Sequence, residues 1–350
     1  MSQMVAGALD RDVAPARVGI VRGWLLMVAG LVVMMAAIGG ATRLTGSGLS
    51  ITEWEVVKGV IPPLGPTEWS AVFEKYKQIP QYARVNPGMT LAEFKTIYWW
   101  EWGHRAFGRA LGLAFAGPAL WFWLSGLISN RLAARLAGVL AIGGLQAFVG
   151  WFMVQSGLVD RVSVSPVRLA MHLTLAVVVL GLLLWLALGL DRKERQAAST
   201  PLAGGALLLV ALTLVQIVLG AFVAGLKAGY TYNTWPLMDG RLIPNGLATL
   251  SPWYLNLAEN VTAVQFNHRM AAYLLLAAAI WHVMRARRLA PGTHVAATAH
   301  HLVAAVALQA ALGVWTLLAG VPIALGLAHQ LGALAVAALA VRHLDAARRG

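Results

Sequence analysis

Four histidines inside long apolar stretches are the residues of this sequence best suited to chemistry. They are His104, His172, His268 and His329. Each lies roughly 4 to 8 residues inside the same end of its stretch, which is a depth of about 6–12 Å in a helix. Ionisable side chains within a membrane are costly and are therefore functional candidates. Two facing imidazoles suit heme iron, so pairing His104 with His172 and His268 with His329 predicts two heme sites.

Other interpretations of these histidines stay open. Each could be a buried histidine that is hydrogen-bonded to backbone carbonyls. Zinc or copper fits less well, because two ligands per pair undersupply a tetrahedral site. Five further histidines lie at or beyond the opposite ends of the apolar stretches, where we expect solvated or interfacial side chains: His282, His294, His300, His301 and His343.

The two histidine pairs differ in the residue that precedes the first ligand. Glu101 lies three residues before His104, on the same helix face, whereas the matching residue before His268 is the neutral Gln265. A carboxylate beside a histidine in a low dielectric can transfer protons or stabilise a cation. The first pair, with Glu101, is therefore predicted to be the reaction site, and the second pair an electron relay. The alternative is that Glu101 caps its helix or pairs with Arg105.

An arginine follows the first ligand of each pair, Arg105 in one half and Arg269 in the other. A guanidinium fork matches a carboxylate, so both arginines are candidates to bind a heme propionate. The other interpretation is an arginine that extends to the membrane interface. The sequence does not decide between Arg105 and Arg109 as the propionate ligand.

Composition indicates the scaffold that positions these residues. Of the 350 residues, 59% are apolar and 12% are charged, which excludes a soluble domain and a disordered chain. Eight apolar stretches are long enough to span a bilayer, which requires roughly 20 residues each. We therefore predict an all-α integral membrane protein with eight transmembrane helices, over residues 21–41, 97–125, 132–156, 168–190, 203–226, 261–286, 296–319 and 323–342.

The net charge of +13 is explained by membrane topology rather than by nucleic-acid binding, for which no motif is present. Basic residues in short segments mark the cytoplasmic side, where we expect both termini. The first 20 residues contain Asp10 and Asp12 and do not resemble a transit peptide, which favours a bacterial inner membrane. The basic residues of that side are Arg11, Arg17, Arg22, Arg131, Arg135, Arg192, Lys193, Arg195, Arg285, Arg287, Arg288, Arg342, Arg348 and Arg349.

The two halves of the chain resemble each other. Gly103-His104-Arg105 matches Asn267-His268-Arg269, and Leu145-Gln146-Ala147 matches Leu308-Gln309-Ala310. Parallel repeats are a known membrane architecture. We predict two tandem, pseudo-symmetric four-helix bundles, 21–190 and 203–342, joined by a cytoplasmic linker over 191–202 and flanked by segments 1–20 and 343–350. The first bundle carries a long outer loop over 42–96, in which Thr67 to Lys77 is expected to form a surface helix.

From about residue 20 to 342 the chain resembles the heme A synthase family. The resemblance lies in Glu101-Trp102-Gly103-His104-Arg105, in Gln265-Phe266-Asn267-His268-Arg269 and in Ala328-His329-Gln330. Two outer-loop segments, residues 39–50 and Tyr232 to Met238, also resemble the family. This sequence has no cysteine, whereas some family members have a cysteine pair in the first outer loop. It resembles the cysteine-free branch of the proteobacterial and mitochondrial enzymes.

The resemblance implies a reaction, the oxidation of the C8 methyl of heme O to a formyl group by successive hydroxylation. It implies that His268 and His329 hold a heme b cofactor, and that His104, His172 and Glu101 form the substrate heme site. An upstream heme O synthase and an electron acceptor are implied partners, and a homo-oligomer stays open. Two other functions stay open too: a quinol-linked bis-heme electron-transfer protein, and a heme transporter or chaperone.

Overall fold

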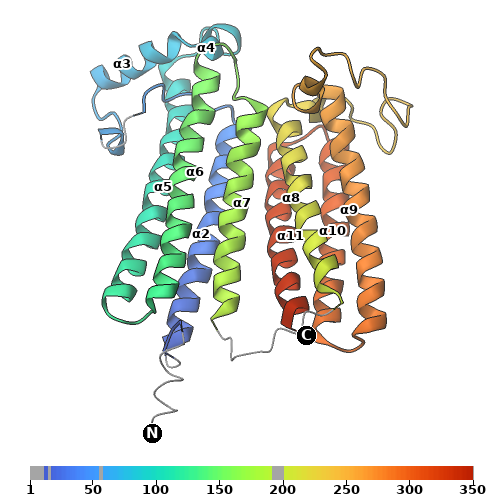
Figure 1. The fold of residues 1–350 in the computed structure, drawn as a ribbon. Coiled ribbons are helices and arrows are strands. Elements are labelled where there is room, and N and C mark those ends of the chain that lie inside the picture. The colour runs from blue at the N-terminus through green and yellow to red at the C-terminus, as the bar shows by residue number, and fades with distance from the viewer. Residues whose placement is uncertain (1–11, 15–16, 55–57, 191–200, 350) are drawn as a thin grey trace.

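The computed structural model describes residues 12–14, 17–54, 58–190 and 201–349. Within these residues, long helices form two groups that stand side by side, with helical and irregular segments above them (Figure 1). Segment 1–20 and linker 191–202 fall largely outside the described residues, as do Asp10, Arg11, Arg192, Lys193 and Arg195. The long helices are α2 (Val18–Leu44), α5 (Leu91–Leu124), α6 (Asn130–Leu158), α7 (Pro166–Gly189), α8 (Ala203–Gly225), α9 (Val261–Leu289), α10 (His294–Leu318) and α11 (Ile323–Arg349).

Each of the eight predicted apolar stretches is helical, and seven of the described helices are long and apolar enough to cross a membrane. The helix that falls short in composition is α9. It is as long as α6 but carries Gln265, His268 and Arg269 near its start and basic residues in its last turn. The hydropathy of α9 alone therefore does not identify it as a membrane span.

Local sequence signals set where the long helices begin. The Thr90 hydroxyl accepts a hydrogen bond from the Glu93 amide at 3.3 Å, and the Glu93 carboxylate accepts one from the Thr90 amide at 2.7 Å. This reciprocal capping starts α5 at Leu91, six residues before the predicted boundary. The Asn260 side chain caps α9 in a similar way, by accepting from the amides of Thr262 and Ala263.

Four helices of each half contact one another in a closed ring: α2, α5, α6 and α7 in the N-terminal half, and α8, α9, α10 and α11 in the C-terminal half. The halves meet mainly where α7 packs on α8 and where α11 packs on α7 and α2. Polar side chains reinforce this boundary. Gln330 of α11 donates to the Ala36 carbonyl of α2 at 2.7 Å, and Arg43 of α2 donates to the Ala224 carbonyl of α8.

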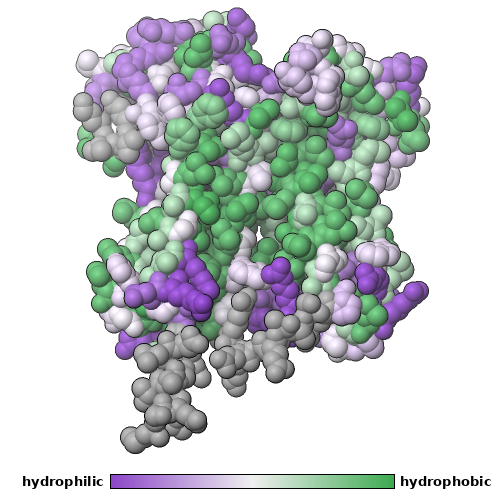
Figure 2. Space-filling model, in the orientation of Figure 1, coloured by the Kyte–Doolittle hydropathy of each residue, from purple (hydrophilic) through white to green (hydrophobic). Residues whose placement is uncertain are grey.

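Large apolar side chains cover the outside of the helices. Leu113 and Leu308 are 74% and 71% exposed, and Figure 2 shows an apolar band across the middle of the molecule between polar ends. Water does not tolerate such a surface, but lipid does. The exposed apolar band therefore identifies the long helices as a membrane-embedded body.

The first outer segment folds over one end of the N-terminal half. It contains η2 (Lys58–Val60), α3 (Pro66–Lys77) and α4 (Pro80–Arg84), so the predicted surface helix over Thr67 to Lys77 is confirmed. An aromatic cluster fixes this cap onto the start of α5, with Phe73, Tyr76 and Phe94 buried against one another. The second outer segment contains η3 (Ala228–Tyr230) and η4 (Trp253–Leu257) above the C-terminal half.

Candidate heme-binding site

The structure brings together the histidines that the sequence pairs. His268 of α9 and His329 of α11 face each other with ring centroids 6.5 Å apart and nearly perpendicular planes. His104 of α5 and His172 of α7 lie close enough in the other half to interact electrostatically. Both pairs are therefore formed between helices of one half, and no pairing is crossed between halves.

Each of these four imidazoles lies against a glycine of a neighbouring helix. A Cβ built on any of the four glycines would lie 2.7 to 3.0 Å from an imidazole atom, which is closer than real Cβ contacts. The rings therefore occupy space that any other residue would fill. The ring and glycine pairs are His104 with Gly39, His172 with Gly150, His268 with Gly220, and His329 with Gly313.

Three glutamines hold the histidines from the same neighbouring helices. The side-chain amide nitrogens of Gln146, Gln216 and Gln309 donate to the backbone carbonyls of His172, His268 and His329, at 3.0, 3.1 and 2.7 Å. The nitrogens of Gln216 and Gln309 also lie 3.1 Å from the Nδ1 atom of the histidine that each contacts.

The carbonyl oxygens of the three glutamines are buried and have no hydrogen-bond partner within the described residues. A buried acceptor without a donor is costly and calls for an explanation. When an imidazole binds a metal through Nε2, its Nδ1 carries the proton and requires an acceptor. Each unpartnered oxygen belongs to an amide that already contacts the histidine, so a turn of that amide would supply the acceptor, and these residues suit a histidine-ligated heme iron.

Glu101 joins the outer cap to the N-terminal half. Its carboxylate is 3% exposed and accepts hydrogen bonds from the Ser50 hydroxyl at 2.8 Å and the Ile51 amide at 2.9 Å. Its second oxygen accepts from Arg105, one turn later on α5, at 2.7 Å. Arg105 also donates to the carbonyls of Ile51 and Glu53. The predicted alternative of a Glu101–Arg105 ion pair is thus present, and the pair fastens residues 50–53 next to His104.

The C-terminal half uses an equivalent but neutral arrangement. The Gln265 oxygen accepts from Arg269 at 3.0 Å, and its amide donates to the Ala228 carbonyl at 2.7 Å. Arg269 further donates to the Tyr232 carbonyl at 2.9 Å. In both halves the arginine therefore secures an outer loop to the helix that carries the first histidine. A simple interfacial role does not describe either arginine.

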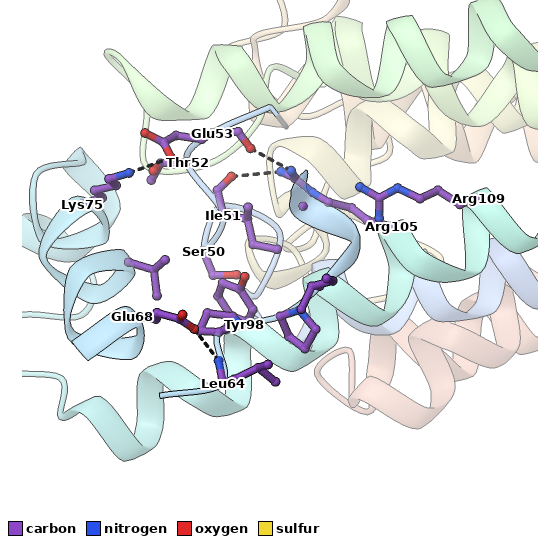
Figure 3. Close-up of a pocket in the computed structure, with 15 residues that line it drawn as sticks. Ser50, Ile51, Thr52, Glu53, Leu64, Glu68, Lys75, Tyr98, Arg105 and Arg109 are labelled. Atoms are coloured by element: carbon purple, nitrogen blue, oxygen red, sulfur yellow. Dashed lines mark hydrogen bonds and ion pairs between the residues drawn. The ribbon is translucent and has the colours of Figure 1, made fainter. Parts of the chain in front are cut away.

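A cavity of about 330 Å³ adjoins the Glu101–Arg105 pair, between the outer cap and α5 (Figure 3). Its wall includes Ser50, Glu53, Tyr98, Arg105 and Arg109. In Figure 3, the Arg105 guanidinium reaches toward the 51–53 backbone, and Arg109 follows along α5. The cavity brings both candidate propionate-binding arginines to one surface near His104.

Comparison with known proteins identifies the family. The COX15-CtaA family model, described as cytochrome oxidase assembly protein, matches residues 22–341. The chain belongs to this family. A heme A synthase of Methylobacterium sp. (strain 4-46) is 53% identical over 342 residues, covering 97% of this chain and 95% of the relative. Heme A synthases of Sinorhizobium medicae and Agrobacterium fabrum are 50% and 48% identical, covering 92% and 98% of this chain and 88% and 94% of the relatives.

One prediction about this COX15-CtaA family member was wrong. His282 and His343, expected to be solvated or interfacial, are 1% and 0% exposed. Their Nε2 atoms lie 2.7 Å apart, and the Nδ1 atom of His343 lies 2.9 Å from the Thr298 hydroxyl. They are buried because α11 continues to Arg349, past the predicted end at 342, and its last turns join a buried apolar cluster with residues of α9 and α10.

Sequence reasoning missed the glutamines and glycines that contact the histidines. The signal was present, because Gln146, Gln216 and Gln309 each precede their glycine by four residues, which places both on one helix face. Gln146 and Gln309 stood out as markers of the repeat but not as site residues. Their role becomes visible only when the helices that face the histidines are known.

Proposed function

We infer that this chain is a membrane oxidoreductase that converts heme O to heme A by oxidising the C8 methyl to a formyl group. The observation that carries this inference is the identity of about 50% to heme A synthases over nearly the whole chain. The asymmetry between Glu101 and Gln265 supports it over the alternative of a quinol-linked bis-heme electron carrier. A carrier with two equivalent hemes has no need of a carboxylate in one half only.

The two histidine pairs are proposed to hold different hemes. His268 and His329 hold a heme b cofactor, and His104 and His172 bind the substrate heme. The glycine contacts and the unpartnered glutamine oxygens support heme binding at both pairs. When bound, the heme b supplies a one-electron acceptor within the membrane.

Glu101 is proposed as the catalytic carboxylate. It lies one turn before His104, and three donors hold it in place: the Ser50 hydroxyl, the Ile51 amide and Arg105. A carboxylate fixed in this way can stabilise positive charge that develops on the substrate methyl, or accept a proton released from it. If water is the oxygen source, each of two oxidations releases two electrons and two protons, and loss of water from the gem-diol leaves the formyl group.

Arg105 and Arg269 are proposed to bind heme propionates at the two sites. Each already secures an outer loop above its histidine pair, so a propionate would share the guanidinium with backbone carbonyls. A guanidinium presents five donors, which allows both contacts at once. Arg109, in the wall of the neighbouring cavity, is the alternative ligand in the N-terminal half.

The membrane arrangement is proposed to comprise eight spans in two tandem, pseudo-symmetric bundles, with both termini cytoplasmic in the bacterial inner membrane. Although α9 is less apolar than the others, it packs between α8 and α10. Its polar residues Gln265 and Arg269 are buried rather than exposed to lipid, and they bond to backbone carbonyls or to each other. Residues 21–190 would then form the substrate half and 203–342 the cofactor half.

Heme O and an electron acceptor are the partners that this chemistry requires. A farnesyl-transferring heme O synthase is the class of enzyme that must act upstream.

The test is to express the chain in a host that makes heme O but no heme A, and to analyse the extracted pigments by mass and by pyridine-hemochrome spectrum. Heme A or its hydroxylated intermediate is the expected result. A matched His329→Ala variant, which loses a ligand of the proposed heme b, is expected to form neither. Folded protein that contains heme b, has an electron acceptor and leaves heme O unchanged would favour the electron carrier. Heme O bound without conversion would favour a transporter or chaperone.

A further inference from the structure

Three of the four helices that contact the histidines carry the same pair of residues. A glutamine precedes the contacting glycine by four residues in α6, α8 and α10. The exception is α2, where the residue four positions before Gly39 is Met35. Because residues four apart share a helix face, Met35 occupies in α2 the place that Gln216 occupies in α8.

In the C-terminal half, both histidines have an amide partner. Gln216 and Gln309 contact the ring nitrogen Nδ1 as well as the backbone carbonyl of His268 and His329. In the structure, each amide nitrogen donates to Nδ1, whereas a histidine that binds a metal through Nε2 carries its proton on Nδ1 and needs an acceptor there. The unpartnered oxygen of the same amide would supply that acceptor when the amide turns, so each histidine of this half has a side chain in place that can orient its ring.

The histidine rings of the N-terminal half have fewer side-chain partners. Gln146 contacts the backbone carbonyl of His172, whose own Nδ1 is buried without a partner. No hydrogen bond reaches the His104 ring from the described residues. The Met35 methyl group lies instead against α5 at Gly108, 3.1 Å from the Cβ position of that glycine, one turn beyond His104. A thioether is only a weak acceptor, so it cannot replace the amide.

We propose that Met35 is a positioning residue that makes His104 the weakest of the four heme ligands. The N-terminal site would then exchange its heme by release of His104, while the C-terminal site keeps its heme through every turnover. This inference rests on the proposed function and deepens it, because a substrate heme must enter and leave whereas a cofactor heme must stay. It attributes the difference in heme retention between the two sites to the side chains that contact the histidine ligands, and not to Glu101.

The test exchanges the two side chains, in the full-length protein purified from a host that makes heme O. Met35→Gln supplies the missing amide, and the heme retained at the N-terminal site is expected to rise while turnover falls. Gln216→Met removes the amide from His268, and affinity for heme b is expected to fall by roughly 10- to 100-fold. Met34→Gln is the matched control, because the adjacent Met34 is 51% exposed, whereas the Met35 methyl group lies against α5.

The readouts are heme b, heme O and heme A per chain after purification, and the low-spin electron paramagnetic resonance signal of each site. Retained heme b in Met35→Gln shows that this variant is folded. Unchanged heme content in both Met35→Gln and Gln216→Met would overturn the proposal, as would an equal effect of Met34→Gln. Failure of the proposed function is distinguishable, because it would appear as no heme A in the unaltered protein, whatever the variants retain.

Discussion

Replacing Glu101 with glutamine tests how the outer cap and the N-terminal site depend on one carboxylate. The substitution preserves the shape of the side chain and removes one acceptor oxygen. Gln265 shows how a glutamine is satisfied at the matching position, where its amide group donates to the Ala228 carbonyl. At position 101 that amide group would face the Ile51 amide, which is itself a donor.

The magnitude follows from these contacts. Hydrogen bonds to a charged group contribute about 1.5–3 kcal/mol each, and a buried donor left unpaired costs about 1–3 kcal/mol. Arg105 still donates to the carbonyls of Ile51 and Glu53 and to the remaining oxygen at position 101. Only part of the stabilisation of residues 50–53 is therefore lost. We expect docking of residues 50–53 to weaken by about 2–4 kcal/mol, which is roughly a 30- to 1,000-fold increase in the undocked fraction.

Hydrogen exchange at the amides of residues 50–53 measures this change, alongside heme A formation and heme b content. Faster exchange, lower turnover and unchanged heme b are the expected results for Glu101→Gln. Glu93→Gln is the matched control, since Glu93 lies on the same helix but only caps its exposed start. Unchanged exchange would refute the reasoning about the cap. Loss of heme b would refute the assignment of Glu101 to the N-terminal site.

Two further predictions concern packing and pH. A Cβ at Gly205 would lie 2.4 Å from Nδ1 of the buried His282, so Gly205→Ala is expected to destabilise the protein by about 1–3 kcal/mol in thermal unfolding. Gly204→Ala, which meets nothing within 4 Å, should not destabilise it. Burial raises the pKa of Tyr76 above its usual value of 10.0, against an opposing hydrogen bond from Asn86. The neutral phenol is favoured in the folded cap, so this contribution to stability is complete below pH 10 and is lost as pH rises through the folded pKa. Unfolding of the cap measured from pH 8 to 11 should show the decline, and Tyr76→Phe should remove it; an identical profile in both proteins would contradict this role.

The sequence allowed the eight helices and the two histidine pairs to be predicted, since both depend on patterns along one chain. Apolar runs set the helices, and the common depth and repeat of the four histidines indicated their partners. The contacts around them depend instead on which helix faces which. The role of Gln216 follows from the packing of α8 on α9, which no local pattern in α8 reveals.

The burial of His282 and His343 shows the same limit. Their positions at or beyond the ends of two apolar stretches favoured solvated or interfacial side chains, and that inference treats each helix by itself. In the folded chain the two imidazoles bond to each other and reach Thr298 of a third helix, which no spacing within α9 or α11 predicts. For Glu101, the sequence identified the residue and its pairing with Arg105, but not the loop that the pair secures.

The contact of Gln330 across the boundary between the halves has a consequence for how this protein can change. Gln330 directly follows His329, yet its amide lies against Gly40 and bonds to the Ala36 carbonyl in the other half. A Cβ at Gly40 would lie 2.7 Å from that amide oxygen. The two halves, however alike, are therefore no longer interchangeable modules. A chimaera that takes one half from a relative must therefore still combine a glycine at position 40 with a side chain at position 330 that fits against it.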